Sequence, residues 1–189
     1  MQNVQIPRRE PPLEPPGAPQ LRDCGNYNMR ITADGLWHHN GRPIQRPALV
    51  RLFAGLLKRD AAGDYWLETP AERGRIQVDD APFVAVDMTV AGAGAAQRLT
   101  FRTNLDHQVM ADAAHPIGLR SGGRDAARPY VLLDDRIEAL IARPVYYRLA
   151  ELAVERRIAG HVTFGVWSGG AFFALEPPAD AAETSRVAP

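Results

Sequence analysis

The chain has 189 residues, of which 46% are hydrophobic and 23% charged, and its 22 basic and 22 acidic side chains give a formal net charge of zero. This composition is typical of a globular protein and excludes a collagen, a coiled coil, a largely disordered chain and a disulfide-stabilised mini-protein. The neutral charge argues against binding of bulk nucleic acid, which normally requires a basic excess, but it is compatible with a single bound nucleotide.

The two ends of the chain differ in composition from the rest. Residues 1–24 are rich in proline and are expected to form a disordered lead, and residues 177–189 are expected to form a disordered tail. The lead lacks the apolar segment of a signal peptide, and no segment offers the roughly 20 apolar residues of a membrane span. Together with the single cysteine, Cys24, these features predict a cytoplasmic protein that is not associated with a membrane.

Residues 25–80 are expected to be an N-terminal α+β domain. Asp34-Gly35 is a tight-turn signal between residues 29–32 and 36–39, which predicts a β-hairpin. Apolar residues recur one helical turn apart after Pro47, which predicts a helix that ends near Arg59. Further strands are predicted at residues 65–68 and 75–79.

Residues 81–176 are expected to be a second α+β domain. Alternating apolar residues beside the glycine-rich turn 91–94 predict a hairpin of residues 83–90 and 97–103. Pro144 is expected to begin a second helix, which ends near Arg157. The remaining strands are predicted at residues 108–110, 117–119, 130–133, 136–141, 161–167 and 171–176.

The chain contains an internal repeat at a shift of 97 residues. This shift brings several residues into register: Arg46-Pro47 with Arg143-Pro144, Leu52 with Leu149, and Gly63 with Gly160. In each copy a short strand precedes the Arg-Pro pair, and a helix, a glycine and another strand follow it. The sequence therefore predicts an α+β fold with a duplicated core of two tandem antiparallel β-sheet domains, each with one packing helix.

Seven motifs are spread over nearly the whole chain outside its two tails. They are Gly25–Ile31, Asp34–Trp37, Thr69–Glu72, Val78–Val86, Leu99–Asn104, Ala142–Tyr147 and Gly165–Gly170. Together they resemble the bacterial domain-of-unknown-function family 1285. The resemblance implies a C-terminal domain superficially similar to pleckstrin-homology folds and a pocket between the domains for a nucleotide-like ligand, with a role in signalling. The family has no established catalytic residues, so the resemblance assigns none to this chain.

The arginines of the two Arg-Pro pairs are candidates for ligand binding. Arg46 and Arg143 each precede a predicted helix, whose first-turn N–H groups bind anions readily. A cation at this positive end of a helix is mildly unfavourable by itself, so its occurrence in both copies indicates a bound carboxylate or phosphate. The alternative is an internal salt bridge, for example between Arg143 and Glu138.

A second group of candidates surrounds the expected junction between the domains. Asp79 and Asp80 form an acidic pair that can bind a metal ion or a ribose hydroxyl, or that only solvates a turn. The remaining candidates near the junction are Glu72, Arg75, Arg102 and Asn104. The alternative for these residues is a structural role, such as a capping box between Thr69 and Glu72 or an ion pair of Arg102 across its hairpin.

The tip of the last predicted hairpin contains Trp167 and Ser168. An aromatic side chain there can serve as a stacking platform for a ligand or as a lid over the core. The five histidines lack the spacing of a zinc site, and the chain has no Walker loop and no dinucleotide-binding glycine motif. No metal and no cofactor is therefore expected.

The function that these observations favour is non-enzymatic binding of a small anionic, nucleotide-like ligand in the cleft between the domains, coupled to signal transduction. Two alternatives stay open. In the first the protein is an interaction adaptor without a ligand, and in the second it is a small hydrolase or transferase that uses the acidic residues near Asp80. The sequence identifies no protein partner.

Overall fold

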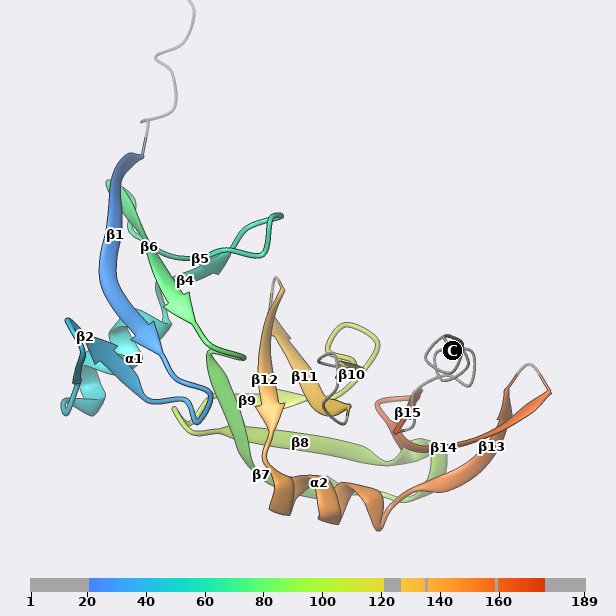
Figure 1. Cartoon of the computed structure of the whole chain (residues 1–189). Coiled ribbons are helices and arrows are strands. Elements are labelled where there is room, and N and C mark those ends of the chain that lie inside the picture. The colour runs from blue at the N-terminus through green and yellow to red at the C-terminus, as the bar shows by residue number, and fades with distance from the viewer. Residues whose placement is uncertain (1–20, 121–126, 135, 159, 176–189) are drawn as a thin grey trace, which may run out of the picture.

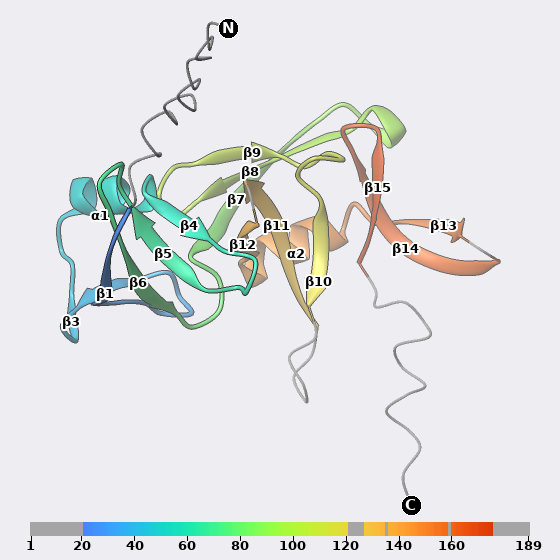
Figure 2. The same cartoon turned by 90° about the horizontal axis from the view of Figure 1, so that it is seen from above.

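The computed structural model describes residues 21–120, 127–134, 136–158 and 160–175, which form three β-sheets and two short α-helices (Figure 1). We call the sheets A, B and C in chain order, and sheets A and C lie at opposite ends of the molecule (Figure 2). The expected tail, and the expected lead up to residue 20, lie outside the described residues. Residues 22–24, which the sequence places in the lead, belong instead to the first strand.

Sheet A consists of six strands with one helix in the middle of their sequence. Its elements are β1 (Arg22–Ile31), β2 (Trp37–His39), β3 (Arg42–Pro43), α1 (Pro47–Ala54), β4 (Leu57–Arg59), β5 (Tyr65–Glu68) and β6 (Glu72–Val78). The strand order is β3-β2-β1-β6-β5-β4, so β1 and β6 lie side by side in the centre, and they run parallel. The predicted hairpin of β1 and β2 is confirmed, and Gly35 in its turn has the φ of +81° that favours glycine.

Sheet B also has six strands, and sheet C has three. Sheet B contains β7 (Phe83–Ala91), β8 (Arg98–Thr103), β9 (Gln108–Met110), β10 (Ile117–Arg120), β11 (Arg128–Asp134) and β12 (Ile137–Ile141), with a 3-10 helix, η1 (Gly94–Ala96), between β7 and β8. The helix α2 (Arg143–Ala150) then leads to sheet C, which contains β13 (Val154–Ile158), β14 (His161–Ser168) and β15 (Ala171–Ala174). The order of sheet B is β10-β11-β12-β7-β8-β9, with β7 and β12 parallel in its centre.

Sheets A and B have the same topology. Read from β9, the order of sheet B is β9-β8-β7-β12-β11-β10, which is the order of sheet A with every strand number raised by six. The chain is thus an α+β protein of two tandem domains on a duplicated core. The sheets are mixed rather than antiparallel throughout, because the first and last strands of each sheet pair in parallel at its centre.

The two helices do not occupy equivalent places in this duplication. α1 lies between β3 and β4 of sheet A, whereas α2 follows the last strand of sheet B. The repeat at a shift of 97 residues therefore describes a local strand–helix–strand segment and not the duplication of the sheets. Both helices also end earlier than predicted, because the residues that follow them pair as strands β4 and β13. Within the described residues, no helix is long and apolar enough to cross a membrane.

The faces that the helices bury also differ. Leu149 of α2 is fully buried, and this helix packs against β7. Leu52 of α1 is 59% exposed, whereas Val50 is buried and Phe53 stacks on the ring of Trp37 at a centroid distance of 6.3 Å. The residue repeat aligns Leu52 with Leu149, but only Leu149 is a core position.

One hydrophobic cluster runs through all three sheets. It includes Ile31 and Leu67 in sheet A, Phe101 in sheet B, Leu149 in α2 and Val166 in sheet C. Burial of apolar side chains is the main force that stabilises a folded chain. The two domains are therefore held together by shared apolar packing as well as by the polar contacts at their junction.

Candidate functional site

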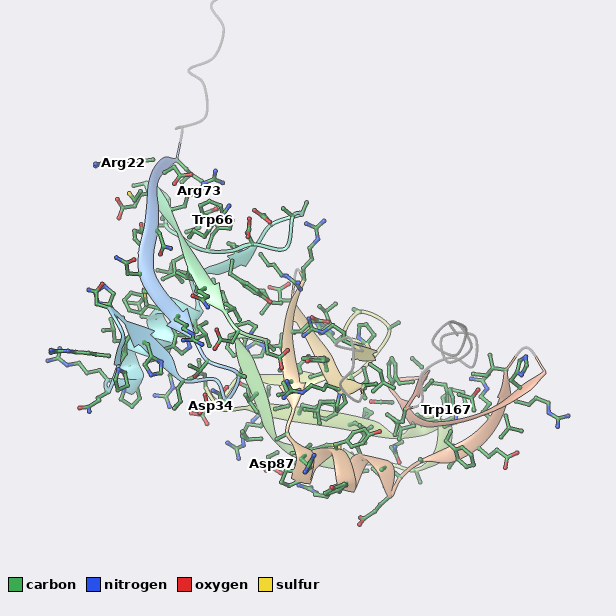
Figure 3. The ribbon with its side chains drawn as sticks, viewed as in Figure 1. Arg22, Asp34, Trp66, Arg73, Asp87 and Trp167 are labelled. Carbon is green, nitrogen blue, oxygen red and sulfur yellow. The ribbon has the colours of Figure 1, made fainter. Side chains whose placement is uncertain are left out.

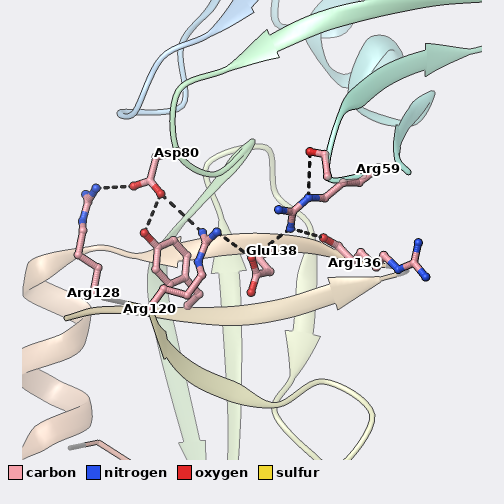
Figure 4. Close-up of polar contacts among 8 residues, drawn as sticks. Arg59, Asp80, Arg120, Arg128, Arg136 and Glu138 are labelled. Atoms are coloured by element: carbon pink, nitrogen blue, oxygen red, sulfur yellow. Dashed lines mark hydrogen bonds and ion pairs between the residues drawn. The ribbon is translucent and has the colours of Figure 1, made fainter. Parts of the chain in front are cut away.

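The link between β6 and β7 carries a carboxylate that gathers cations at the junction between the domains. Asp80 lies in this link, and its side chain is 15% exposed. It accepts a hydrogen bond of 2.7 Å from the Tyr130 hydroxyl and another from the guanidinium of Arg128 (Figure 4). Nη2 of Arg120 lies 3.6 Å from Oδ1 of Asp80. Asp80 thus connects the inter-domain link to β10 and β11.

A second carboxylate, Glu138 on β12, extends this network to sheet A. Nη1 of Arg120 lies 3.3 Å from Oε2 of Glu138, and Nη1 of Arg59 lies 3.6 Å from the same oxygen. Arg59, on β4, also donates a hydrogen bond of 3.2 Å to the carbonyl of Arg136 (Figure 4). Three guanidinium groups, those of Arg59, Arg120 and Arg128, therefore share two carboxylates. The junction network carries an excess of positive charge.

Arg120 and Tyr130 contact each other within the junction network, and Tyr130 is its buried member. The guanidinium of Arg120 lies 3.7 Å from the centre of the Tyr130 ring. Burial, together with the nearby charge of Asp80, raises the pKa of Tyr130 to about 12, so its hydroxyl stays protonated and donates to Asp80. Nε and Nη2 of Arg120 are buried and have no hydrogen-bond partner among the described residues. Buried donors without a partner are unfavourable, so an additional acceptor would stabilise them.

A groove of about 520 Å³ lies at the start of α2. Its lining consists of Ala127, Arg128, Pro129, Leu140, Ile141, Ala142, Arg143, Tyr146 and Tyr147. Arg128 joins the groove to the junction network, because it lines the groove and also donates to Asp80. The groove therefore has two arginines and two tyrosines in its lining.

The start of α2 adds a backbone donor to this groove. Ala142 precedes the helix and provides no side-chain cap, and the first turn contains no acidic residue. The first-turn N–H groups of a helix have no partner within the helix and carry a partial positive charge. Pro144 has no N–H group and Val145 is buried, so the first-turn donor that lies in the groove is the N–H of Arg143.

The structure separates the two arginines that precede the helices. Arg143 lines the groove, and it forms no ion pair with Glu138, whose carboxylate contacts Arg59 and Arg120 instead. Arg46 is exposed before α1 and forms no salt bridge within the described part of the chain. α1 and α2 lie in different domains and well apart (Figure 1). The two helix starts therefore do not form one site.

Asp79 and Asp80 face different partners. Asp79 accepts hydrogen bonds of 2.8 Å and 2.7 Å from Nε and Nη2 of Arg30, and this guanidinium holds the pKa of the Asp79 carboxyl below its usual range. Asp80 instead faces Arg128 and Tyr130. Among the residues that the structure describes, no group of three or more His, Cys, Asp or Glu side chains is arranged to hold a metal ion.

Glu72 and Arg75 lie on β6, outside the groove. Glu72 lines a separate hollow of about 290 Å³. Nη2 of Arg75 lies 2.8 Å from Oδ2 of Asp64, and Cζ of Arg75 lies 5.0 Å from the ring centre of Trp66. Figure 3 labels Trp66 on sheet A. The Thr69 hydroxyl accepts the N–H of Glu72, as in a capping box, but no helix begins there because Glu72 is the first residue of β6.

Arg102 and Asn104 both form contacts with other residues of the chain that give them a structural role. Arg102 lies 3.6 Å from Asp87 on the neighbouring strand, which is the ion pair considered as the alternative. Nδ2 of Asn104 donates a hydrogen bond of 3.2 Å to the carbonyl of Gly35 in the other domain. Asn104 therefore lies at the junction, as expected, and bridges the two domains there.

Trp167 and Ser168 are neighbours on β14 of sheet C, and Figure 3 shows Trp167 far from the junction. Ser168 is fully buried, and its hydroxyl accepts the N–H of Leu99 at 2.9 Å and donates to the carbonyl of Ala111 at 2.6 Å. The ring of Trp167 meets the edge of the Phe172 ring at a centroid distance of 5.4 Å. The hydrogen bonds of Ser168 attach sheet C to sheet B, the ring contact of Trp167 lies within sheet C, and neither residue lines the groove.

The sequence candidates do not include most of the junction network. The missing members are Arg59, Arg120, Arg128, Tyr130 and Glu138. They come from β4 in sheet A and from β10, β11 and β12 in sheet B, which only tertiary folding brings together. The only sequence signal for this network is the composition, with 21 arginines and one lysine. Composition does not predict which arginines lie close together in the fold.

Comparison with known protein families covers both domains. Residues 14–81 match the domain described as "Domain of unknown function (DUF1285), N-terminal domain". Residues 82–175 match "Protein of unknown function (DUF1285), C-terminal domain". No curated protein matches the chain.

Two solved structures are similar to this chain. A crystal structure of a DUF1285 family protein from Silicibacter pomeroyi DSS-3 is 41% identical, covers 87% of either chain and has a TM-score of 0.77. Another, from Shewanella baltica OS155, is 24% identical with a TM-score of 0.52 and covers 66% of this chain and 91% of that one, a likeness of fold alone. The resemblance seen in the sequence motifs is thus confirmed, and the chain belongs to the DUF1285 family, a family of unknown function.

Proposed function

We propose that this protein binds a small anionic, nucleotide-like ligand in the groove at the start of α2, and that this binding serves signal transduction. The observation that carries the proposal is the meeting of Arg128, Arg143, Tyr146 and Tyr147 around one groove of about 520 Å³. Ligand pockets typically have volumes of roughly 300–1,000 Å³ and contain a few polar groups that fix the ligand's orientation. The groove therefore has the size and the chemistry for a ligand of this class.

Each part of the groove suits a different part of such a ligand. The guanidinium groups of Arg128 and Arg143 can each donate two parallel hydrogen bonds to a phosphate or carboxylate. The N–H group of Arg143, in the uncapped first turn of α2, favours the same anion. The exposed ring of Tyr147 can stack on a planar base, whereas Tyr146 packs against the core and donates its hydroxyl to the carbonyl of Leu175.

The groove is not the cleft between the domains that the sequence led us to expect, because its lining residues all lie within residues 127–147 of the second domain. Its connection to the first domain is Arg128, which reaches Asp80 in the inter-domain link. An anion that binds Arg128 competes with Asp80 for the same guanidinium. This competition is a physical route from ligand binding to the contact between the domains, and it supports a signalling role.

The test is isothermal titration of the full chain with AMP, cyclic AMP, inorganic phosphate and adenosine. We expect the phosphate-containing probes to bind and adenosine to bind more weakly. Arg143→Gln should weaken binding of these probes at least tenfold, which corresponds to about 1.4 kcal/mol. The matched control is Arg46→Gln, since Arg46 precedes the other helix and lies outside the groove. Absence of binding, or an equal effect of both substitutions, would overturn the proposal.

Neither alternative function gains a specific observation. Asp80 accepts hydrogen bonds from Tyr130 and Arg128. These contacts give its carboxylate a structural role and do not favour it as the base of a hydrolase or transferase. The adaptor role, and the superficial likeness of residues 81–176 to pleckstrin-homology folds, stay predictions.

A further inference from the structure

The free edge of sheet C is formed by β13, a strand in which every residue is exposed. β13 pairs with β14 on one side, and no strand of the described chain pairs with its other side. Figure 2 shows β13 at the end of the molecule farthest from sheet A. Val154 and Ile158 are apolar and yet 45% and 43% exposed. An exposed edge with apolar side chains is a template for pairing with another strand.

The hairpin geometry shows which backbone groups β13 leaves free. Ile158 pairs with His161, three positions further along the chain, and two residues that pair at this spacing in a hairpin exchange hydrogen bonds. Because hydrogen-bonded and non-hydrogen-bonded pairs alternate along an antiparallel ladder, Arg156 and Val154 also direct their N–H and C=O groups at β14. Glu155 and Arg157 therefore direct their N–H and C=O groups at the free edge.

The sequence of β13, Val-Glu-Arg-Arg-Ile, is complementary to itself when a second copy runs antiparallel about Arg156. In this register Glu155 lies opposite Arg157 of the partner subunit, and Val154 lies opposite Ile158 of the partner subunit. The two opposite-charge pairs fall where both strands direct their free backbone groups at each other. Charged and apolar cross-strand pairs both stabilise antiparallel strands.

Arg156 is the residue that this register places on the two-fold axis, where two like charges face each other. Its guanidinium lies 4.8 Å from the ring centre of Trp167 and 5.2 Å from that of Phe172. These rings belong to β14 and β15, so the side chain lies back across sheet C and away from the free edge. The charges of the two Arg156 side chains are thereby kept apart.

We propose that two copies of this chain associate through antiparallel pairing of their β13 strands. The association joins two copies of sheet C into one continuous six-stranded sheet with the order β15-β14-β13-β13-β14-β15. The partner is a second copy rather than an unrelated strand, because both the charged and the apolar pairs of this edge are satisfied by the same sequence turned about Arg156. This proposal is independent of the proposed ligand groove.

The test is to measure the dimer dissociation constant by sedimentation equilibrium, for the full chain and for variants in which the charges at positions 155 and 157 are reversed. We expect the wild type to dimerise reversibly at concentrations up to about 100 μM, as suits a small interface. Glu155→Arg alone, and Arg157→Glu alone, should each raise the dimer dissociation constant at least tenfold, because each places like charges opposite each other twice. The double variant Glu155→Arg/Arg157→Glu should restore dimerisation. Arg42→Glu, an exposed charge reversal in sheet A, is the control and should leave the dissociation constant unchanged.

A backbone substitution tests the same edge without a change in folding. Arg157→Pro removes an N–H group at the free edge, a place where an edge strand tolerates proline, so it should abolish dimerisation and leave the melting temperature nearly unchanged. A monomeric wild type, or a dimer that Glu155→Arg and Arg157→Glu do not weaken, would overturn the proposal. Slow hydrogen exchange at the amides of Glu155 and Arg157 in a monomer would also overturn it. Another segment of the same chain would then cover the edge.

Discussion

The side-chain amide of Asn104 joins the two domains at the turn that contains Gly35. Nδ2 of Asn104 donates to the carbonyl of Gly35 at 3.2 Å, and Oδ1 accepts the N–H of Val84 at 3.1 Å. One side chain thus satisfies backbone groups on both sides of the junction. A Cβ atom at position 35 would lie 2.6 Å from Nδ2 of Asn104, so this contact requires glycine.

We expect Gly35→Ala to lower the free energy of unfolding by about 2–3 kcal/mol, from the strain of a positive φ and the displaced hydrogen bond. The matched control is Gly41→Ala, since Gly41 has a φ of +76° and open space around it. The control should lose only about 1–2 kcal/mol. Urea unfolding of both variants measures the difference. Equal losses would show that the Asn104 contact does not stabilise the junction.

The hairpins were predictable because their signals are local. Asn40 and Gly41 both have positive φ in the turn between β2 and β3, and an Asn-Gly pair is the typical sequence signal for such a turn. The parallel pairing of β1 with β6 has no such signal, because it depends on which of several strands meet after the chain has collapsed. The duplicated sheet order was therefore not visible in the residue repeat, which reports only the Arg-Pro starts of the helices.

Leu149→Ala and Leu52→Ala should have very different effects, although the residue repeat aligns the two positions. Leu149 is fully buried, so its truncation should cost about 2–5 kcal/mol of unfolding free energy. Leu52 is 59% exposed, so its truncation should change stability by less than about 0.5 kcal/mol. Thermal and urea unfolding measure both. Comparable losses in the two variants would contradict the different burial of the two helix faces.

The ion pair of Arg30 with Asp79 should make stability depend on acid pH. Because Arg30 lowers the pKa of Asp79 in the folded state, the pair stabilises the fold above the unfolded-state pKa of about 3.9 and loses this effect as the pH falls through the lower folded-state pKa. We expect Asp79→Asn and Arg30→Gln each to flatten the same acid part of the pH profile of unfolding. An unchanged profile in Asp79→Asn would show that the pair adds no pH-dependent stability.

The candidate groove could be predicted only in part. Arg143 was found because an Arg-Pro pair at a helix start is a local pattern. Arg128 has no pattern of its own, and its role depends on Asp80, which is 48 residues away in the sequence. Ser168 was a ligand-binding candidate because it lies near the tip of a predicted hairpin. It is instead buried against sheet B, and this burial comes from tertiary packing that the residues beside it in the sequence do not predict.

Asp80→Asn should separate the structural role of Asp80 from its effect on the groove. The substitution preserves the shape of the side chain and removes the charge that holds Arg128 and Arg120. We expect the free energy of unfolding to fall by about 1–3 kcal/mol, because hydrogen bonds to a charged group are lost. Affinity for inorganic phosphate should instead rise, by up to about fivefold, because Arg128 no longer has a competing carboxylate and a half-exposed pair contributes about 1 kcal/mol or less.

The increase in phosphate affinity has to depend on Arg128 if the groove and the junction compete for its guanidinium. The double variant Asp80→Asn/Arg128→Gln should therefore lose the gain in phosphate affinity while it keeps the loss of stability. Salt should reduce the gain as well, since the Arg128 side chain is 47% exposed and its interactions are screened. Titration calorimetry with phosphate at low and high salt measures these effects. An affinity that Asp80→Asn leaves unchanged would mean that Arg128 does not connect the groove to the domain junction.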